Sequence, residues 1–223
     1  MLDSLNFIGF GVFGGTQMFS PEKLCDFINQ IQEEGYKVVD GFAFPFDSPR
    51  NIISNSEEIV DRVLNSCREN YSTISEHFWK YPFEFIYSIN SEDAPGWTLS
   101  TPVDTLIGVN RDLGEHNSLE FLKILRKTLE YYPIYYGCGF SDEAPDISSV
   151  DLDTNFEVAE VCEINFYSST YIEEHLDREH LLSAPAWCVE ELANGVLLIP
   201  SLRAIYTDDP DSLDTVNQHL GWA

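Results

Sequence analysis

The sequence predicts an α+β fold in which mixed sheets carry packed helices, and three observations support this prediction. Apolar segments with the length and the alternating pattern of strands are interleaved with segments whose apolar residues recur at the spacing of one helix face. Hydrophobic residues make up 43% and aromatic residues 13% of the 223-residue chain, which is enough for a core without cross-links. A strand–helix–strand pattern at residues 5–44 recurs at residues 103–140, so two related halves, each with a β-α-β unit, are expected. We expect residues 1–223 to form a single compact unit, with possible halves at 1–96 and 97–223.

The N-terminal half begins with a predicted strand at Leu5–Phe13. Ser20-Pro21-Glu22 then provides an N-cap, a proline at the first helical position and an acid in the first turn, so a helix follows and ends at Gly35. Tyr36–Phe44 has the composition of a strand, which ends at the next residue, a proline, because proline cannot donate to a central ladder. Further along we expect a helix at residues 56–68. Two strands divided by Pro82 follow within residues 71–89, and another strand lies within residues 97–110.

The C-terminal half is predicted from its apolar spacing and its turns. Leucines at helical spacing indicate a helix at 118–131, followed by a strand at 134–140 and a polar, acidic loop, predicted to be mobile, at 141–155. Asn194-Gly195 is typical of a type I′ hairpin turn, and Asp209-Pro210 of the start of a last helix. The other predicted elements are a strand at residues 158–167 and one or two short helices at 171–182. The two strands of the hairpin are expected at residues 187–192 and 196–199.

The cysteines are predicted to be buried free thiols. They form no C-x-x-C pair, and each falls in a predicted apolar helix stripe or strand, where a thiol behaves as a small hydrophobic group: Cys25, Cys67, Cys138, Cys162 and Cys188. The N-terminus lacks the basic and apolar regions of a signal peptide, and no apolar run is long enough to span a membrane. The expected location is therefore the cytoplasm.

No motif in the sequence predicts catalysis, a cofactor or a metal ion. Residues 9–14 match G-x-G-x-x-G, with Asp40 in the next strand, but the helix begins only after Ser20, too late for its N-terminus to meet a pyrophosphate. We interpret this motif as part of a glycine-bearing strand. His175 and His180 lie five residues apart, whereas two metal ligands on one helix face need a spacing of three or four. A non-catalytic protein is favoured, and an enzyme with an unrecognised active site remains an alternative.

The charge of the chain is strongly negative and unevenly distributed. Thirty-eight acidic and twelve basic residues give a net charge of −26, and residues 141–223 alone hold eighteen of the acids and two of the bases. Such a surface repels the phosphates of nucleic acids and anionic lipids, so neither is expected as a partner. The expected partner is a basic protein, bound by carboxylates of the C-terminal region: Glu173, Glu174, Asp177, Glu179, Glu190, Glu191, Asp208, Asp209, Asp211 and Asp214.

Four of the twelve basic residues lie close together in the sequence, at Arg111, Lys123, Arg126 and Lys127. Two interpretations are open. They could form a solvated face that relieves local repulsion, or they could contact the acidic C-terminal half of the same chain. The four tryptophans are predicted to be core or interface residues, and Trp222 is expected to dock the end of the chain.

The stretch Pro185-Ala186-Trp187-Cys188-Val189-Glu190-Glu191-Leu192 precedes a glycine turn and an apolar strand. Together with the acidic α+β build, it resembles the acidic immunity proteins of bacterial polymorphic-toxin systems, over the last third of the chain. The resemblance implies an inhibitor that occludes a basic toxin or enzyme and performs no chemistry of its own. The alternative is a halophile-adapted cytoplasmic or virus-associated protein, in which the acidity and the low count of five lysines are a solvent adaptation.

Overall fold

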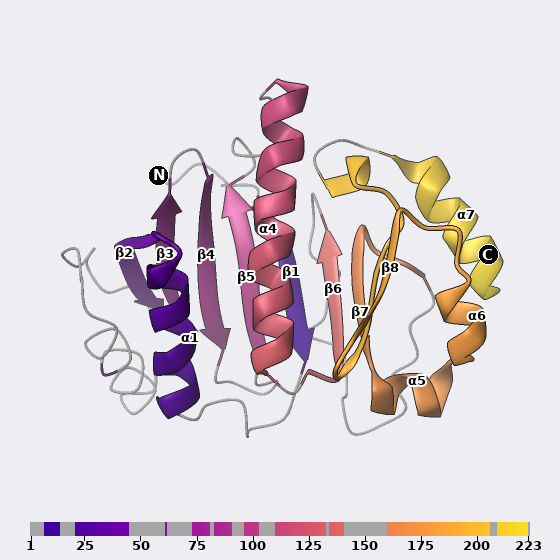
Figure 1. Ribbon diagram of the computed structural model, residues 1–223, viewed down its shortest axis with the longest axis horizontal. Coiled ribbons are helices and arrows are strands. Elements are labelled where there is room, and N and C mark those ends of the chain that lie inside the picture. The colour runs from indigo at the N-terminus through magenta and orange to yellow at the C-terminus, as the bar shows by residue number, and fades with distance from the viewer. Residues whose placement is uncertain are drawn as a thin grey trace.

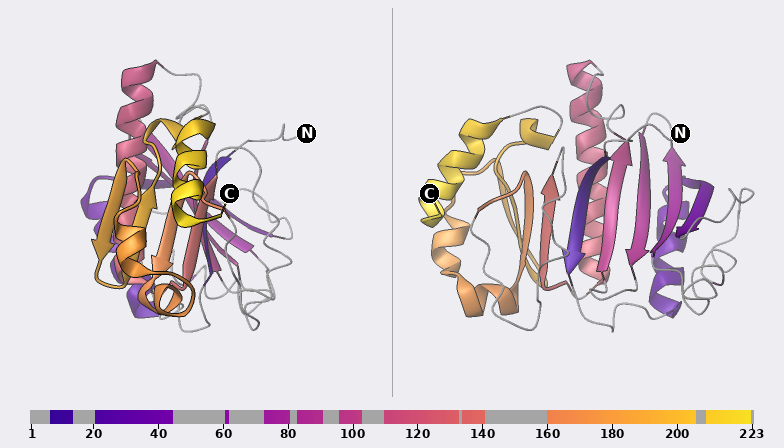
Figure 2. Two further views of the ribbon diagram at one scale, coloured as in Figure 1. Left: turned by 90° about the vertical axis from the view of Figure 1, so that its right-hand side faces the viewer. Right: turned by 180° about the vertical axis from the view of Figure 1, so that it is seen from behind.

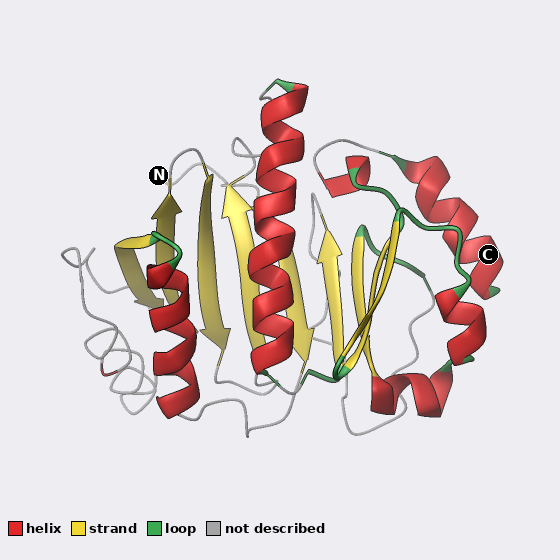
Figure 3. Ribbon diagram, in the orientation of Figure 1, coloured by secondary structure: helices red, strands yellow, loops and turns green. Residues whose placement is uncertain are grey.

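The described strands form one antiparallel sheet of nine, with two long helices on one face and shorter helices packed against its C-terminal strands (Figures 1 and 3). The strand order is β2-β3-β4-β5-β1-β6-β7-β9-β8. The structure is a computed structural model, and it describes residues 7–13, 21–44, 61, 73–80, 83–90, 96–102, 110–132, 134–140, 160–205 and 209–222.

The α+β class is confirmed, but the sheet is not mixed. All described strand pairs are antiparallel. For β3–β4 and β8–β9 the reason is local, because two-residue links reverse the chain into the neighbouring strand. The strands are β1 (Phe7–Phe13), β2 (Lys37–Phe44), β3 (Thr73–Lys80), β4 (Phe83–Asn90), β5 (Gly96–Pro102), β6 (Tyr136–Phe140), β7 (Ile164–Ser168), β8 (Cys188–Leu192) and β9 (Gly195–Ile199).

Two groups of helices cover the sheet. Helices α1 (Pro21–Glu33) and α4 (Arg111–Tyr131) lie on the same face, which is clearest when the molecule is seen from behind (Figure 2). Three shorter helices gather beside β7, β9 and β8: α5 (Ser169–His175), α6 (Arg178–Leu182) and α7 (Pro210–Leu220). A short 3-10 helix, η3 (Arg203–Ile205), lies between β9 and α7 in the sequence.

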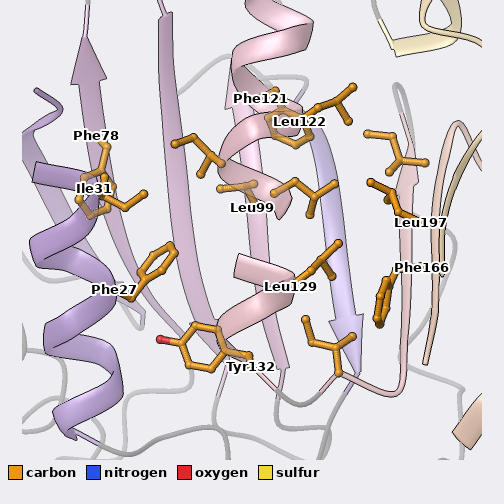
Figure 4. Packing of buried hydrophobic residues seen from close by; sticks show 14 of the residues in the cluster. Phe27, Ile31, Phe78, Leu99, Phe121, Leu122, Leu129, Tyr132, Phe166 and Leu197 are labelled. Atoms are coloured by element: carbon orange, nitrogen blue, oxygen red, sulfur yellow. The ribbon is translucent and has the colours of Figure 1, made fainter. Parts of the chain in front are cut away.

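The buried side chains form two clusters, one on each face of the C-terminal strands. The larger cluster fills the space between the sheet and α1 and α4, and includes Phe27, Leu99 and Phe121 (Figure 4). The smaller one lies between β6, β7 and β9 and helices α5–α7. Along β9, Leu197 belongs to the first cluster and Leu198 to the second, as strand alternation requires. Strands β7 and β9 are therefore buried along their whole length and hold the three short helices in place.

The predicted elements near the N-terminus are confirmed. Among the later ones, the strands on either side of Pro82, the strand β6, the two short helices, the two hairpin strands and the last helix are also confirmed, whereas the start of the helix predicted at 118–131 is wrong. Helix α1 starts at Pro21, and Gly35 follows it with a left-handed φ of 91°. Helix α4 begins at Arg111 rather than at residue 118: Asn110 caps it by accepting a hydrogen bond from the Leu113 amide at 3.0 Å. Its first turns bury Asn117 and Ser118 rather than apolar residues, so their pattern carried no helical signal.

Other predictions fall partly or wholly outside the described residues. This is the case for the helix predicted at 56–68, of which Asp61 alone is described and is helical, and for the loop at 141–155. The strand predicted at 158–167 is described as a strand only from Ile164. Before it, the Asn165 side chain accepts a hydrogen bond from the Cys162 amide at 2.8 Å, which folds the chain into a local turn instead of a ladder.

Cys138 and Cys162 form a disulfide, with their Cα atoms 5.8 Å apart, so the prediction of free thiols is wrong for these two. The bond joins β6 to the segment that enters β7. Topology explains the error, since antiparallel β6 and β7 bring together residues that lie 24 positions apart in the sequence. Cys25 and Cys188 are half-buried thiols, and Cys67 lies outside the described residues.

The β8–β9 hairpin exists as predicted, but its turn is not the predicted one. Leu192 pairs with Gly195, so Ala193 and Asn194 are the two turn residues and Gly195 already belongs to β9. The Asn194 side chain donates a hydrogen bond to the Leu129 carbonyl at 2.6 Å. It thereby satisfies a carbonyl at the end of α4, where a helix has no backbone partner of its own.

Replacing Asn194 with alanine is expected to lower the free energy of unfolding by about 1 kcal/mol, because a carbonyl of the last α4 turn loses its donor. Urea denaturation measures the loss. Gln218→Ala on the exposed side of α7 is the matched control and is expected to change the free energy little. Equal effects in the two variants would contradict the capping role.

Candidate binding surface

The acidic residues that the sequence predicts to bind a partner lie mainly on the three short helices. Glu173 and Glu174 are exposed on α5, Glu179 on α6 and Asp177 at its N-cap, and Asp211 and Asp214 on α7. We call these six residues the acidic surface. Glu190 and Glu191 lie on β8, Asp209 is the N-cap residue of α7, and Asp208 lies outside the described residues.

Some of these carboxylates also hold the local structure. The Asp177 side chain caps α6 by accepting a hydrogen bond from the His180 amide at 2.8 Å. Asp209 accepts one from the Ser201 hydroxyl at 2.6 Å, and this hydrogen bond is the main reason that the pKa of Asp209 is lowered. Glu174 accepts one from the Tyr135 hydroxyl, also at 2.6 Å. Burial first, and then Glu174, raise the pKa of Tyr135 to about 12.

The two carboxylates of β8 are neutralised within the chain. Arg126 of α4 contacts Glu190 at 2.7 Å, and Arg178 of α6 contacts Glu191 at 2.6 Å. One part of the predicted binding set is therefore already paired, which leaves less of its charge for a partner. Of the two interpretations of the basic cluster, contact with the acidic C-terminal half is correct for Arg126.

The two lysines of the basic cluster bind elsewhere. Both Lys123 and Lys127 form ion pairs with Glu34, which follows α1. Burial acts to raise the pKa of Glu34, but the hydrogen bonds and charges of the two lysines outweigh it and hold that pKa below its usual value. These pairs join α1 to α4. Arg111 is exposed at the first turn of α4.

The acidic surface keeps most of its negative charge. Arg178 is the single arginine or lysine within α5, α6 and α7, and Glu191 already engages it. The carboxylates of this surface stand on short helices that bury Tyr171, Leu181 and Val216 in the smaller core cluster. Their backbone positions are therefore fixed by packing. A rigid negative surface attracts cationic partners and raises their rate of association.

A pair of stacked histidines joins α6 to α7 beside this surface. The rings of His180 and His219 lie 4.2 Å apart, centroid to centroid, with an interplanar angle of 21°. Nε2 of His180 lies 2.5 Å from the His219 carbonyl oxygen, and Nε2 of His219 lies 3.0 Å from that of His180. Asp177, Glu179, His180 and Ser183 line a shallow, open depression here. Because each Nε2 points at a backbone oxygen, the two rings do not converge on a common ligand, and no group of three metal-ligating side chains occurs within the described ranges.

Residues 9–13 of the G-x-G-x-x-G match lie in strand β1, as predicted, and Gly14 lies outside the described residues. Gly9 and Gly11 lie in β1, which has antiparallel neighbours on both sides, β5 and β6. A dinucleotide site needs a strand of a parallel sheet that leads directly into a helix. Asp40 lies on β2, and β3, β4 and β5 separate that strand from β1, so it cannot reach the glycine segment.

Comparisons with known proteins identify a fold. No protein-family model and no curated protein matches the sequence. Among solved structures, the Pseudomonas aeruginosa T6SS protein PA0821 is similar, with a TM-score of 0.59 over 97% of this chain and 76% of that chain. The two proteins share a fold. Their sequences are 10% identical, so the likeness extends to architecture alone.

Trp187 is a surface feature whose exposure the sequence did not reveal. It is 48% exposed, in the segment between α6 and β8. Trp222, in contrast, is half-buried against the smaller core cluster, with its ring 6.3 Å from that of Tyr167, as predicted for a residue that docks the chain end. A tryptophan beside a strand is usually a core residue, so its type gave no signal of exposure.

No helix in the described part of the chain is both long and apolar enough to cross a membrane.

Proposed function

We propose that this chain is a non-catalytic immunity or inhibitor protein, which binds a basic toxin or enzyme through its acidic surface and occludes it. The observation that carries the proposal is the set of exposed carboxylates on α5–α7, whose helices contain one basic side chain, Arg178, already engaged by Glu191. A cationic partner gains complementary charge over the whole surface, whereas anionic partners are rejected.

The shared fold supports the same proposal. The similar protein from Pseudomonas aeruginosa is described as a T6SS protein, which places it in a secretion system, a context compatible with immunity proteins. The net charge of −26 acts in the same direction as the acidic surface, since a negative protein attracts a cationic toxin.

The compartment in which the partner is met belongs to the proposal as well. The sequence predicts the cytoplasm. The Cys138–Cys162 disulfide favours an oxidising compartment instead, because cytosolic thiols are kept reduced. Trapping the thiols with an alkylating reagent in intact cells would show in which state the pair exists.

Removing charge from the acidic surface is expected to weaken binding of deca-arginine, used as the cationic probe, roughly 30-fold or more, because several complementary charges are lost together. The test variant neutralises five exposed residues: Glu173→Gln, Glu174→Gln, Glu179→Gln, Asp211→Asn and Asp214→Asn. Asp177 is kept because it caps α6. Titration calorimetry at several salt concentrations measures the dissociation constant.

The control variant neutralises five acids on α1 and α4, away from α5–α7, and so has the same net charge: Asp26→Asn, Glu33→Gln, Asp112→Asn, Glu115→Gln and Glu130→Gln. Its binding is expected to stay within about threefold of the unmodified chain, because charges far from an interface are screened. Equal losses in both variants would contradict a localised interface. Unfolding of the unmodified chain below about 1 M salt would instead favour solvent adaptation, since carboxylates repel when screening is weak.

A further inference from the structure

Trp187 is an aromatic side chain left in water by a well-packed part of the fold. It is 48% exposed, and among the described residues Leu119, 44% exposed on α4, is the comparable large hydrophobic side chain. An indole is the largest apolar group a residue can bury, so leaving half of it in water gives up stabilisation that folding would otherwise gain. Tryptophan is enriched at protein interfaces, so this side chain is a candidate contact residue.

The backbone beneath Trp187 is rigid. Its amide donates a hydrogen bond to the Pro200 carbonyl at 2.9 Å, directly beside the Cys188–Ile199 pair of the β8–β9 ladder. The Ala186 amide donates to the Ala184 carbonyl at 2.8 Å, and Ala184 is buried. The backbone position from which the indole projects is therefore fixed before binding. A segment whose backbone is already ordered loses less conformational entropy when a partner covers it.

Trp187 stands where the outermost strand meets the acidic helices. Five residues, 183–187, join α6 to β8, and β8 is the last strand in the sheet order, so no described strand pairs with its outer edge. Glu190 and Glu191 on this strand are already paired with Arg126 and Arg178. The negative charge open to a cationic neighbour lies on α6, at Glu179, and at its N-cap residue Asp177.

We propose that Trp187 is the aromatic anchor of the interface with a cationic protein partner, and that an arginine of the partner packs against the indole face. This inference rests on the proposed function and adds to it the position and chemistry of the central contact. A guanidinium is attracted by the indole ring, and tryptophan is among the residues that dominate binding energy at interfaces. The acidic surface on α6 then attracts the remaining positive charges of the partner.

The test uses deca-arginine as the probe in dilute buffer. Trp187→Ala is expected to weaken its binding about tenfold, and Trp187→Phe less, because phenylalanine keeps a weaker aromatic face. Leu119→Ala is the matched control, since it removes the other exposed large hydrophobic side chain of the described residues, and it is expected to leave affinity unchanged. Both side chains are half exposed, so circular dichroism is expected to show intact folds.

A second measurement reports on the indole itself. In a nitrogen-15 correlation spectrum, the indole N–H signal that disappears in Trp187→Phe is expected to shift when deca-arginine is added and to stay in place with deca-glutamate. If Trp187→Ala binds deca-arginine as tightly as the unmodified chain and that signal does not shift, the proposal that Trp187 is the aromatic anchor is wrong.

The outcomes separate this inference from the function on which it rests. Loss of binding in the five-residue acidic-surface variant, together with full binding by Trp187→Ala, would overturn the anchor and leave the proposed function standing. An unmodified chain that does not bind deca-arginine at all would count against the proposed function itself. A dimer of the unmodified chain that Trp187→Ala dissociates would show that a second copy, rather than a cationic partner, covers the indole.

Discussion

Gly195→Ala is expected to lower the free energy of unfolding by about 3 kcal/mol, because the new Cβ has no space in the sheet. Gly195 pairs with Leu192 of β8 on one side and with Ser168 of β7 on the other. A Cβ at this position would lie 2.7 Å from the Phe166 ring and 2.9 Å from the Ser168 Cα atom, and would collide with the Tyr167 carbonyl oxygen. The collision can be relieved only if strands β7 and β9 move apart.

The matched control is Gly221→Ala at the end of α7. Gly221 has a φ of 77°, and a Cβ there would meet nothing within 4 Å, so the substitution costs only the left-handed conformation, about 1 kcal/mol. Guanidinium denaturation of both variants separates a steric collision from a conformational cost. A Gly195→Ala variant that is no less stable than Gly221→Ala would show that β7 and β9 tolerate a wider spacing.

The Asn194-Gly195 pair shows what the sequence can and cannot predict. The dipeptide predicted a hairpin, and the hairpin is present. Its register was wrong because both residues serve distant elements: Asn194 caps α4, and Gly195 allows β9 to approach β7. Neither contact leaves a local pattern, since the partners lie far away in the sequence. By contrast, Pro21 and Gly35 are local signals, and the helix between them was predicted almost to the residue.

The candidate binding surface was predictable to a similar extent. The position of the acids along the chain indicated the C-terminal region, and six of them do share the short helices α5–α7. What the sequence could not show is which acids are already paired. Glu190 is neutralised by Arg126, 64 positions away, and only the packing of α4 against β8 brings the two together.

Removing the disulfide is expected to cost about 3 kcal/mol of the free energy of unfolding, because the unfolded chain gains the entropy of a loop whose ends lie 24 residues apart. The variant is Cys138→Ser with Cys162→Ser, measured by urea denaturation without reducing agent. Cys25→Ser with Cys188→Ser is the control and is expected to cost less, because replacing these half-buried thiols removes no cross-link. Adding dithiothreitol to the unmodified chain is expected to reproduce the loss.

The same disulfide links stability to the proposed interface. Cys138 lies in the smaller core cluster and Cys162 packs against it, together with Tyr171 of α5, Leu181 of α6 and Val216 of α7. When the disulfide is absent, local opening of this cluster becomes easier, and the helices that present the acidic surface lose part of their support. Hydrogen exchange in α5–α7 is therefore expected to accelerate in the double serine variant, while exchange in α4 changes less. Uniform acceleration across both groups would mean that the disulfide stabilises the fold as a whole and does not act on the binding surface in particular.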